Sequence, residues 1–272
     1  MYMSHLMIDI GDNPDRPRPG RLWLRDVYHV HQRLCMAFPS EARVKRDVEF
    51  LQPFQEDDFP LLRNPDVKPE DPRHSFLFRI DTGIQDGART VILVQSALKP
   101  DWDYAFQNAR FLAADPEWKE YAPTFEVGQE LRFRIRINLS KKSKDLRNTR
   151  EETDAYGRPK SQSKRVAVTW DKDQKPDEAI RAWFGAKAVR NGFALDNFQL
   201  VHLGWVSGYR GKTKVPSGED RPKHKMRFRS ALIEGTLAVT DAPCFSQAVA
   251  SGIGSAKAFG FGLLSLAPVR AG

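Results

Sequence analysis

The plainest pattern in the chain is an alternation of apolar and polar residues near its middle. Leu131, Phe133, Ile135 and Ile137 alternate with three arginines and an asparagine over residues 131–138. Successive side chains of a strand point to opposite faces, so this segment predicts a strand with one face in a core. The opposite face would carry a row of guanidinium groups. We expect this strand to complete the first half of the molecule.

The residues before this strand read as alternating strands and helices. Apolar residues at intervals of three and four predict a helix over 22–38. With the other elements the order is β-α-β-β-α-β, given by strands at 2–10, 75–80, 90–94 and 131–138 and helices at 22–38 and 102–112.

The same order is expected to repeat after a polar, charged stretch at 141–163. The second set comprises strands at 165–170, 198–206, 226–239 and 261–267 and helices at 176–191 and 242–251. A duplicated β-α-β-β-α-β order is the ferredoxin-like, or split βαβ, pattern. We therefore expect an α+β protein with two tandem ferredoxin-like (RRM-like) domains. Their expected bounds are 1–140 and 164–272, with 141–163 as a linker or insertion.

Basic charge is concentrated in two parts of the 272-residue chain. The whole chain has a formal net charge of +8, yet residues 132–165 alone carry +8 and residues 209–229 carry +6. The remainder is therefore acidic, and the two basic segments favour an anionic partner such as nucleic acid.

Several classes of protein are disfavoured by the sequence. Cys35 and Cys244 lie far apart and offer neither a disulfide framework nor paired metal ligands. There is no secretory signal pattern and no apolar run approaching the roughly 18 residues of a membrane span, so we expect a soluble cytoplasmic protein. No HExxH motif, no cysteine pair and no convincing carboxylate cluster is present, which disfavours a metal-dependent nuclease. We expect neither a metal nor a cofactor.

Tyr28 and His31 are the first candidates for chemistry. They are three residues apart on the expected helix, so they share a face, whereas His29 points away from both. A phenol beside an imidazole is suited to proton transfer. The alternative is that His31 is a structural histidine at the edge of the apolar stripe.

The residues after the last expected helix form a glycine-rich segment. Gly252, Gly254, Gly260 and Gly262 surround Lys257. Glycines let the backbone approach a ligand, and successive N–H groups can hold a phosphate. The segment is neither a Walker loop nor a dinucleotide fingerprint. A tight, closely packed turn is the alternative.

Basic residues on strands and loops are candidate RNA contacts. The usual aromatic signature of an RNA recognition motif is missing, which favours loops and basic faces over stacking on a sheet. Residues 208–229 predict a basic hairpin between two strands, with a solvated loop as the alternative. The candidate cations are Arg132, Arg134, Arg136, Lys164, Arg165, Arg210, Lys212, Lys214, Lys223, Lys225, Arg227, Arg229 and Lys257.

Three segments together resemble the CasE family, the CRISPR precursor-RNA endoribonucleases of type I-E systems. They are residues 1–4 (MYMS), 26–32 (DVYHVHQ) and 252–268 (GIGSAKAFGFGLLSLAP). Further similar segments are residues 93–96, 131–138, 164–166 and 234–241, in collinear order along the chain.

This resemblance implies both a fold and a function. The fold is two tandem ferredoxin-like domains. The function is binding of the repeat stem-loop of precursor CRISPR RNA and metal-independent cleavage at the 3′ base of the hairpin. The 2′-OH attacks the phosphate and leaves a 2′,3′-cyclic phosphate and a 5′-OH. The product is retained in the Cascade complex, whose other subunits, including the backbone subunit, are implied partners. A non-catalytic RNA-binding subunit of the same fold and an unrelated enzyme for a small anionic substrate are the alternatives.

The resemblance also assigns roles to particular residues. It makes His31 the catalytic histidine and Tyr28 its tyrosine, 252–262 the glycine-rich loop, and 208–225 the hairpin that enters the RNA groove. The chain departs from the family pattern at three kinds of position. A lysine of some relatives is replaced by Met36, and Lys45, Lys257 or nothing takes its place. Asn138 is followed by leucine where the family has proline. Residues 12–20, 51–73 and 141–163 are long insertions without an assigned role.

Overall fold

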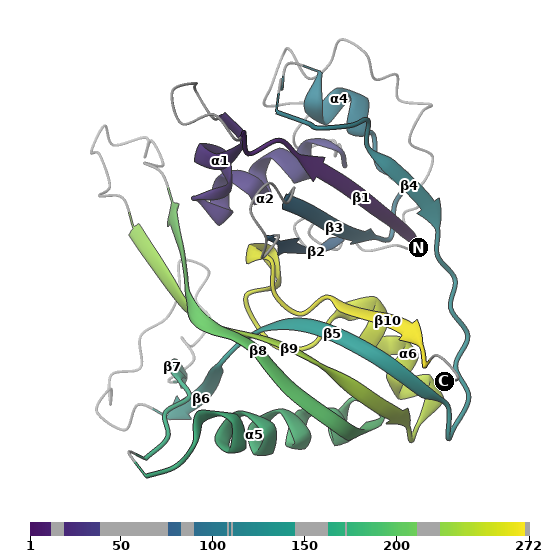
Figure 1. Ribbon diagram of the computed structural model, residues 1–272, viewed down its shortest axis with the longest axis vertical. Coiled ribbons are helices and arrows are strands. Elements are labelled where there is room, and N and C mark those ends of the chain that lie inside the picture. The colour runs from purple at the N-terminus through teal and green to yellow at the C-terminus, as the bar shows by residue number, and fades with distance from the viewer. Residues whose placement is uncertain are drawn as a thin grey trace, which may run out of the picture.

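Two four-stranded antiparallel sheets organise the chain, with a small two-stranded sheet beside them. The computed structural model describes residues 1–11, 19–38, 76–82, 90–107, 109, 111–144, 163–171, 173–210 and 224–269. In Figure 1 one large sheet with its helices lies above the other. The expected α+β class is confirmed.

The first sheet is built by the first half of the chain. Its elements are β1 (Tyr2–Ile8), α1 (Pro19–Leu24), α2 (Val27–Met36), β2 (Phe76–Asp81), β3 (Thr90–Ser96), α4 (Trp102–Phe106) and β4 (Glu117–Glu120). The strands lie in the order β2-β3-β1-β4, and every pair is antiparallel. That is the strand order of a ferredoxin-like unit.

The second sheet repeats this topology. Its elements are β5 (Glu130–Asn138), α5 (Pro176–Arg190), β8 (Phe193–Arg210), β9 (His224–Val239), α6 (Ala242–Ser251) and β10 (Leu264–Pro268), with the short 3-10 helix η5 (Lys257–Phe259) between the last two. The order β10-β5-β9-β8 matches that of the first sheet, strand for strand. The expected tandem ferredoxin-like fold is therefore confirmed.

The prediction that the alternating strand belongs to the first half of the molecule is wrong. β5 does not complete the first half; it pairs with β9 and β10 and opens the second. The fourth strand of the first sheet is β4, whose four side chains are all exposed and which therefore shows no apolar alternation. The chain passes from one sheet to the other between residues 120 and 130, rather than at residue 140.

The expected linker also begins as a strand. β6 (Ser140–Lys144) pairs with β7 (Ser163–Ala167), and these two form the small sheet. The segment expected as a strand at 165–170 is therefore not the first strand of the second sheet. Its polar, cationic residues suit an exposed two-stranded ribbon better than a core strand.

The expected helix at 22–38 is divided into two. Asp26 has an extended backbone, with φ −118°, and its carboxylate accepts a hydrogen bond from the backbone N–H of Tyr28 at 2.9 Å. This is an N-cap, an interaction that contributes about 1 kcal/mol to helix stability. The cap starts α2 at Val27 and so fixes the direction in which Tyr28 and His31 project.

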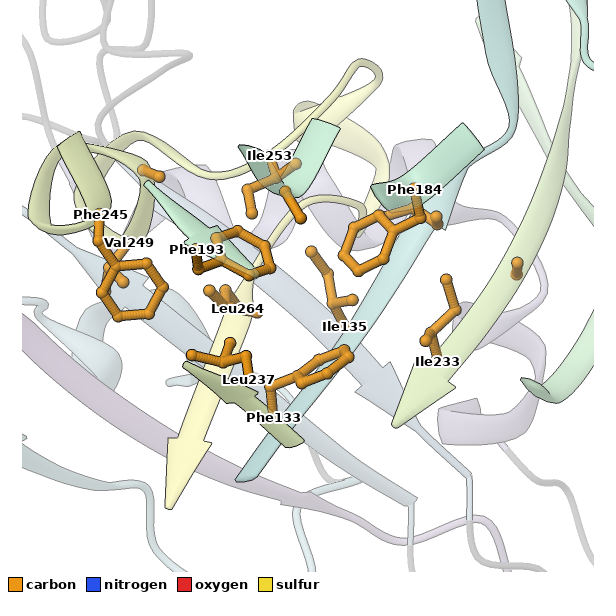
Figure 2. Packing of buried hydrophobic residues seen from close by; sticks show 14 of the residues in the cluster. Phe133, Ile135, Phe184, Phe193, Ile233, Leu237, Phe245, Val249, Ile253 and Leu264 are labelled. Atoms are coloured by element: carbon orange, nitrogen blue, oxygen red, sulfur yellow. The ribbon is translucent and has the colours of Figure 1, made fainter. Parts of the chain in front are cut away.

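Each sheet has its own apolar core. In the second core, the apolar side of β5 meets α5, α6 and β8, and Figure 2 shows Phe133 and Ile135 facing Phe184 and Phe193. The rings of Phe184 and Phe193 are 6.2 Å apart, centroid to centroid. In the first core, α2 packs with Leu34 and Val30 against the strands.

A buried arginine connects the two sheets. Arg79 of β2 is 3% exposed and donates hydrogen bonds to the carboxylate of Asp81, at 2.8–3.0 Å. Its Nη1 also reaches the second sheet, donating to the carbonyl oxygen of Arg134 at 2.9 Å and to Oγ of Ser265 at 2.8 Å. Because these bonds satisfy a buried charge, the two sheets are held in a fixed relation.

Candidate functional site

Two segments of the second half of the chain, the end of β8 and η5, meet beside α2. Gly208, near the end of β8, lies against the first turn of α2: a β-carbon there would be 3.1 Å from Cγ2 of Val27 and 3.4 Å from Oδ1 of Asp26. The short helix η5 contacts both α2 and β2. In Figure 1 the yellow segment after α6 accordingly lies between the two sheets, next to α2.

The ring of Phe259 is shared by these segments. Its centroid lies 6.5 Å from that of Tyr28 and 6.4 Å from that of His31. Phe228 of β9 is also stacked on Phe259, with 4.9 Å between the ring centroids. Phe259 therefore joins the glycine-rich segment to the helix and to the hairpin formed by β8 and β9.

His31 is packed among aromatic side chains and is only 7% exposed. Its ring stacks on Phe76 at 5.5 Å and on Phe78 at 6.5 Å between centroids. Sγ of Cys35, one turn later on α2, is 3.5 Å from Nε2. Tyr28 is more open, and both rings reach Phe259 as expected for residues on one helix face. The exposed His29 contacts Asp26 instead, as its opposite direction predicts.

The glycine-rich segment follows a path that needs glycine at specific points. Gly260 has φ +81°, and a β-carbon there would lie 3.2 Å from the ring of Phe78. Gly254 has φ +92° but faces open space. The first glycine thus serves packing, whereas the second leaves backbone accessible. The tight, closely packed turn is seen at Gly260, and binding of a ligand to the open backbone at Gly254 stays a prediction.

Lys257 lies in the middle of this segment and is half-buried. Burial lowers the pKa of its ammonium group below the usual range. Desolvation favours loss of the charge, whereas an anion nearby would favour the charged form. Lys257 is the one cation of residues 252–262, and it lies on η5, which contacts α2.

Two of the three arginines on β5 lie between the sheets. Nη1 of Arg134 is 3.1 Å from the carboxylate of Glu234, and its Nε is 3.8 Å from that of Asp81. Burial lowers the pKa of Arg136; Asp81 opposes that shift, and the nearby Arg79 and Arg134 add to it. The expected row exists, but Arg134 is paired with carboxylates. Arg132 is the exposed member.

The candidate cations of the two ribbons are only partly described. Arg165 and Arg227 are exposed, and Arg229 is partly buried. Lys164, Arg210 and Lys225 lie on strands β7, β8 and β9, but their side chains are outside the description. The residues wholly outside it are Lys45, Lys212, Lys214 and Lys223, with the insertion at 51–73 and most of those at 12–20 and 141–163.

Sequence reasoning missed three residues that build this site: Phe259, Phe228 and Gly208. The available signals were two phenylalanines among glycines, Phe259 and Phe261, and one phenylalanine between Arg227 and Arg229. In the part of the chain that the structure describes, no three His, Cys, Asp or Glu side chains gather to hold a metal ion. Nor does that part contain a helix long and apolar enough to cross a membrane.

Comparison with known proteins places this arrangement in a family. Residues 1–268 match the model of a family described as CRISPR associated protein. The chain is 28% identical over 205 residues to the CRISPR-associated endoribonuclease Cse3 of Thermus thermophilus, covering 73% of this chain and 82% of that protein. It is 26% identical over 270 residues to the Cascade subunit CasE of Escherichia coli K12, covering 99% and 100%.

Solved structures show the same fold. A CRISPR endoribonuclease Cse3 bound to a 19-nucleotide RNA superposes with a TM-score of 0.61 at 25% identity, covering 98% of this chain and all of that one. The Cas6e protein of Escherichia coli K-12 gives 0.53 at 24% identity, covering 99% of this chain and all of that one. The match over nearly its whole length shows that this chain belongs to the family of CRISPR-associated proteins and confirms the expected resemblance to CasE.

Proposed function

We propose that the chain is an endoribonuclease that binds the repeat hairpin of precursor CRISPR RNA and cleaves it at the 3′ base. The cleaved RNA then stays bound, with this protein as a subunit of a Cascade complex. The main support is the position of Tyr28 and His31. Both lie beside the glycine-rich segment, and the base of the basic hairpin lies against the same helix. The relatives named above, an endoribonuclease and a Cascade subunit, support this assignment.

The proposed chemistry uses an oxygen of the RNA itself. The 2′-OH upstream of the scissile phosphate loses its proton and forms a new bond to phosphorus. The bond from phosphorus to the 5′-oxygen breaks, and that oxygen takes up a proton. The products are a 2′,3′-cyclic phosphate and a 5′-OH, so atoms and charge balance without added water.

His31 transfers a proton at one of these two oxygens. A placed imidazole contributes typically 10²–10⁴-fold to such a step. Tyr28 orients His31 or the phosphate. Lys257 and the open backbone around Gly254 supply positive charge and N–H donors for the phosphorane.

The residues around His31 limit the sides from which RNA can reach its imidazole. The imidazole is covered by Phe76 and Phe78 from the sheet and by Phe259 from the glycine-rich segment. Only Phe259 belongs to a segment with positive-φ glycines on both sides, at Gly254 and Gly260. RNA bound at this segment would therefore reach the imidazole from the side of Phe259.

The burial of His31 favours one second candidate, an RNA-binding subunit that does not cleave. In that case His31 is a core residue of α2, and the basic surfaces alone bind the RNA. Both candidates predict RNA binding, so binding does not separate them.

A cleavage assay with the full chain separates them. Repeat RNA is incubated with the protein and resolved on a denaturing gel, with and without EDTA. We expect one cut at the 3′ base of the hairpin, unchanged by EDTA, and a product ending in a cyclic phosphate. RNA that is bound but intact would instead establish the second candidate.

A matched RNA tests the mechanism. A single 2′-deoxy nucleotide just upstream of the scissile phosphate removes the attacking oxygen and should abolish cleavage while leaving binding intact. A deoxy nucleotide one position further upstream is the control. Cleavage of the first substrate would exclude the proposed attack.

A further inference from the structure

The long hairpin of β8 and β9 has two different faces. Trp205 is paired in register with Arg229, and Val206 with Phe228. Directly paired residues share a face, and the next pair along lies on the other. Phe228 and Val206 face the first core and Phe259. Trp205, Arg229 and, two residues away, Arg227 therefore occupy the face turned away from His31.

An exposed indole dominates that second face. Trp205 is 55% exposed. The guanidinium of Arg227 lies 4.8 Å from the centroid of its ring, and that of Arg229 lies 6.0 Å away. These are cation–π distances. The ring is thus held beside two positive charges while much of it remains open to solvent.

Arg229 is itself fixed in place. Its guanidinium stacks over Trp170 at 3.7 Å, and its Nη1 donates a hydrogen bond to the carbonyl oxygen of Val168 at 2.8 Å. Trp170 and Val168 both follow β7, so the end of the small sheet contacts the hairpin at Arg229. Because the arginine is already ordered, a ligand that used it would lose little further side-chain entropy.

The chemistry of this surface fits an unpaired nucleotide. Bases stack on exposed aromatic rings without regard to sequence, and guanidinium groups pair with phosphate. A protein interface of ordinary size buries about 800 Å² on each partner around an apolar centre. The other large apolar side chains exposed in the described residues lie on other segments (Leu22, Trp118, Val127, Val189 and Val269). A single indole between two cations does not provide such a centre.

We propose that Trp205, Arg227 and Arg229 form a stacking platform for one unpaired nucleotide that flanks the bound RNA hairpin. This inference rests on the proposed binding of a repeat hairpin. It assigns the two faces of one ribbon to different parts of the RNA. One face closes the site around Phe259, and the other holds the single-stranded flank.

The experiment compares two RNAs and three variants of the full chain. The RNAs are the repeat hairpin with a short single-stranded flank and the same hairpin trimmed to its base pairs. The variants are Trp205→Leu, Trp205→Phe and Trp118→Leu. Trp118 is the matched control: it is 42% exposed and lies 4.6 Å from the ammonium nitrogen of Lys99, but on β4 of the first sheet. Affinities are measured by fluorescence anisotropy at one fixed salt concentration.

Trp205→Leu should weaken binding of the flanked RNA roughly 5- to 150-fold, the range of one lost base–aromatic stack. Binding of the trimmed hairpin should not change. Trp205→Phe should retain most of the affinity, and Trp118→Leu all of it. Because Trp205 is an exposed residue, its replacement leaves both cores intact.

Three results would overturn the platform: no loss for Trp205→Leu, an equal loss for both RNAs, or an equal loss for Trp118→Leu. If Trp205→Leu left both RNA affinities intact but prevented assembly with the purified partner subunits, the surface would belong to a protein. The proposed function is tested separately, by cleavage of the flanked hairpin by the wild type, because that RNA keeps the nucleotide on the 3′ side of the scissile phosphate. A flank bound through Trp205 without any cleavage would refute the nuclease and leave the platform standing.

Discussion

The two sheets share a topology, but the helices that follow their first strands differ in use. In the second half, α5 directs Ile180, Phe184 and Ala188 into the core of its own sheet. In the first half, α2 also buries apolar residues, yet its His31 and Tyr28 contact Phe259, which belongs to the other half. The repeated fold does not create a site by itself. The site arises where segments of the second half reach the helix of the first.

The hairpins of the two halves show how this reach is obtained. The second and third strands along the first half of the chain, β2 and β3, have six and seven residues. Their counterparts β8 and β9 have 18 and 16. The added length carries Gly208 to the N-terminus of α2 and leaves Trp205 on the outer face. The extension of one hairpin therefore distinguishes two otherwise equivalent units.

The largest expected effect is a loss of cleavage on substitution in α2, with a substitution in α5 as the comparison. His31→Ala should lower the rate of cleavage about 10²–10⁴-fold, because it removes the proposed proton-transfer group. Hairpin affinity should stay within a few-fold of the wild type. Single-turnover cleavage on a denaturing gel and anisotropy measure the two quantities at a temperature where the variant is folded.

Phe184→Leu on α5 is the control for loss of packing. It should lower the free energy of unfolding by less than the ~3–5 kcal/mol typical of removing a whole buried ring. Cleavage per folded molecule should be unchanged. Equal losses of cleavage in both variants would mean that the two helices do not differ in function.

A smaller effect is expected from the glycine-rich segment. Gly260→Ala places a side chain at φ +81° and 3.2 Å from the ring of Phe78, so η5 must shift. The strain should cost about 1–2 kcal/mol of unfolding free energy. A displaced Phe259 and Lys257 should lower cleavage by up to about 10²-fold.

Gly128→Ala is the matched substitution at the start of the second sheet. Gly128 has φ +85°, and a β-carbon there would meet nothing within 4 Å. The backbone strain is therefore the same, but the site is remote. Urea unfolding should show a loss of stability from backbone strain in both variants, and only Gly260→Ala should impair cleavage. A comparable cleavage defect in Gly128→Ala would assign the effect to stability alone.

The smallest effect is expected from Lys257→Met. Burial lowers the pKa of Lys257 from its ordinary value of 10.5, so the unfolded chain binds this proton more tightly than the folded one. The resulting cost to stability is full below the folded pKa and disappears as the pH rises towards 10.5.

Replacing this lysine should accordingly raise the melting temperature slightly at neutral pH and lower RNA affinity a few-fold. The difference in melting temperature should close as the pH is raised. Thermal melts at neutral and alkaline pH measure it. A variant less stable than the wild type at neutral pH would contradict the sign derived from burial.

Local signals in the sequence predicted most elements but not their partners. The bounds of α6, 242–251, were predicted as observed, because proline and glycine stand beside its two ends. The alternation in β5 predicted a strand but gave no information on which sheet it joins, since that depends on long-range pairing with β9 and β10. β4 was missed because a four-residue strand with exposed polar side chains has no apolar pattern.

The site was predictable in its parts rather than in its assembly. The face shared by Tyr28 and His31 follows from helical spacing, and their role follows from family resemblance. The burial of His31 does not, because the rings of Phe76, Phe78 and Phe259 come from other segments. Likewise, nothing local shows that Arg134 meets Asp81 and Glu234, which lie on separate strands.

The membership of β5 in the second sheet bears on how the protein can be divided. A truncation at residue 140 would leave this strand on the N-terminal fragment, without β9 and β10 and with its apolar row uncovered. A strand without its partners tends to pair with strands of other molecules and to aggregate. A cleaner dissection falls between β4 and β5, and even there each fragment would lose the arginine connection that Arg79 makes across the junction.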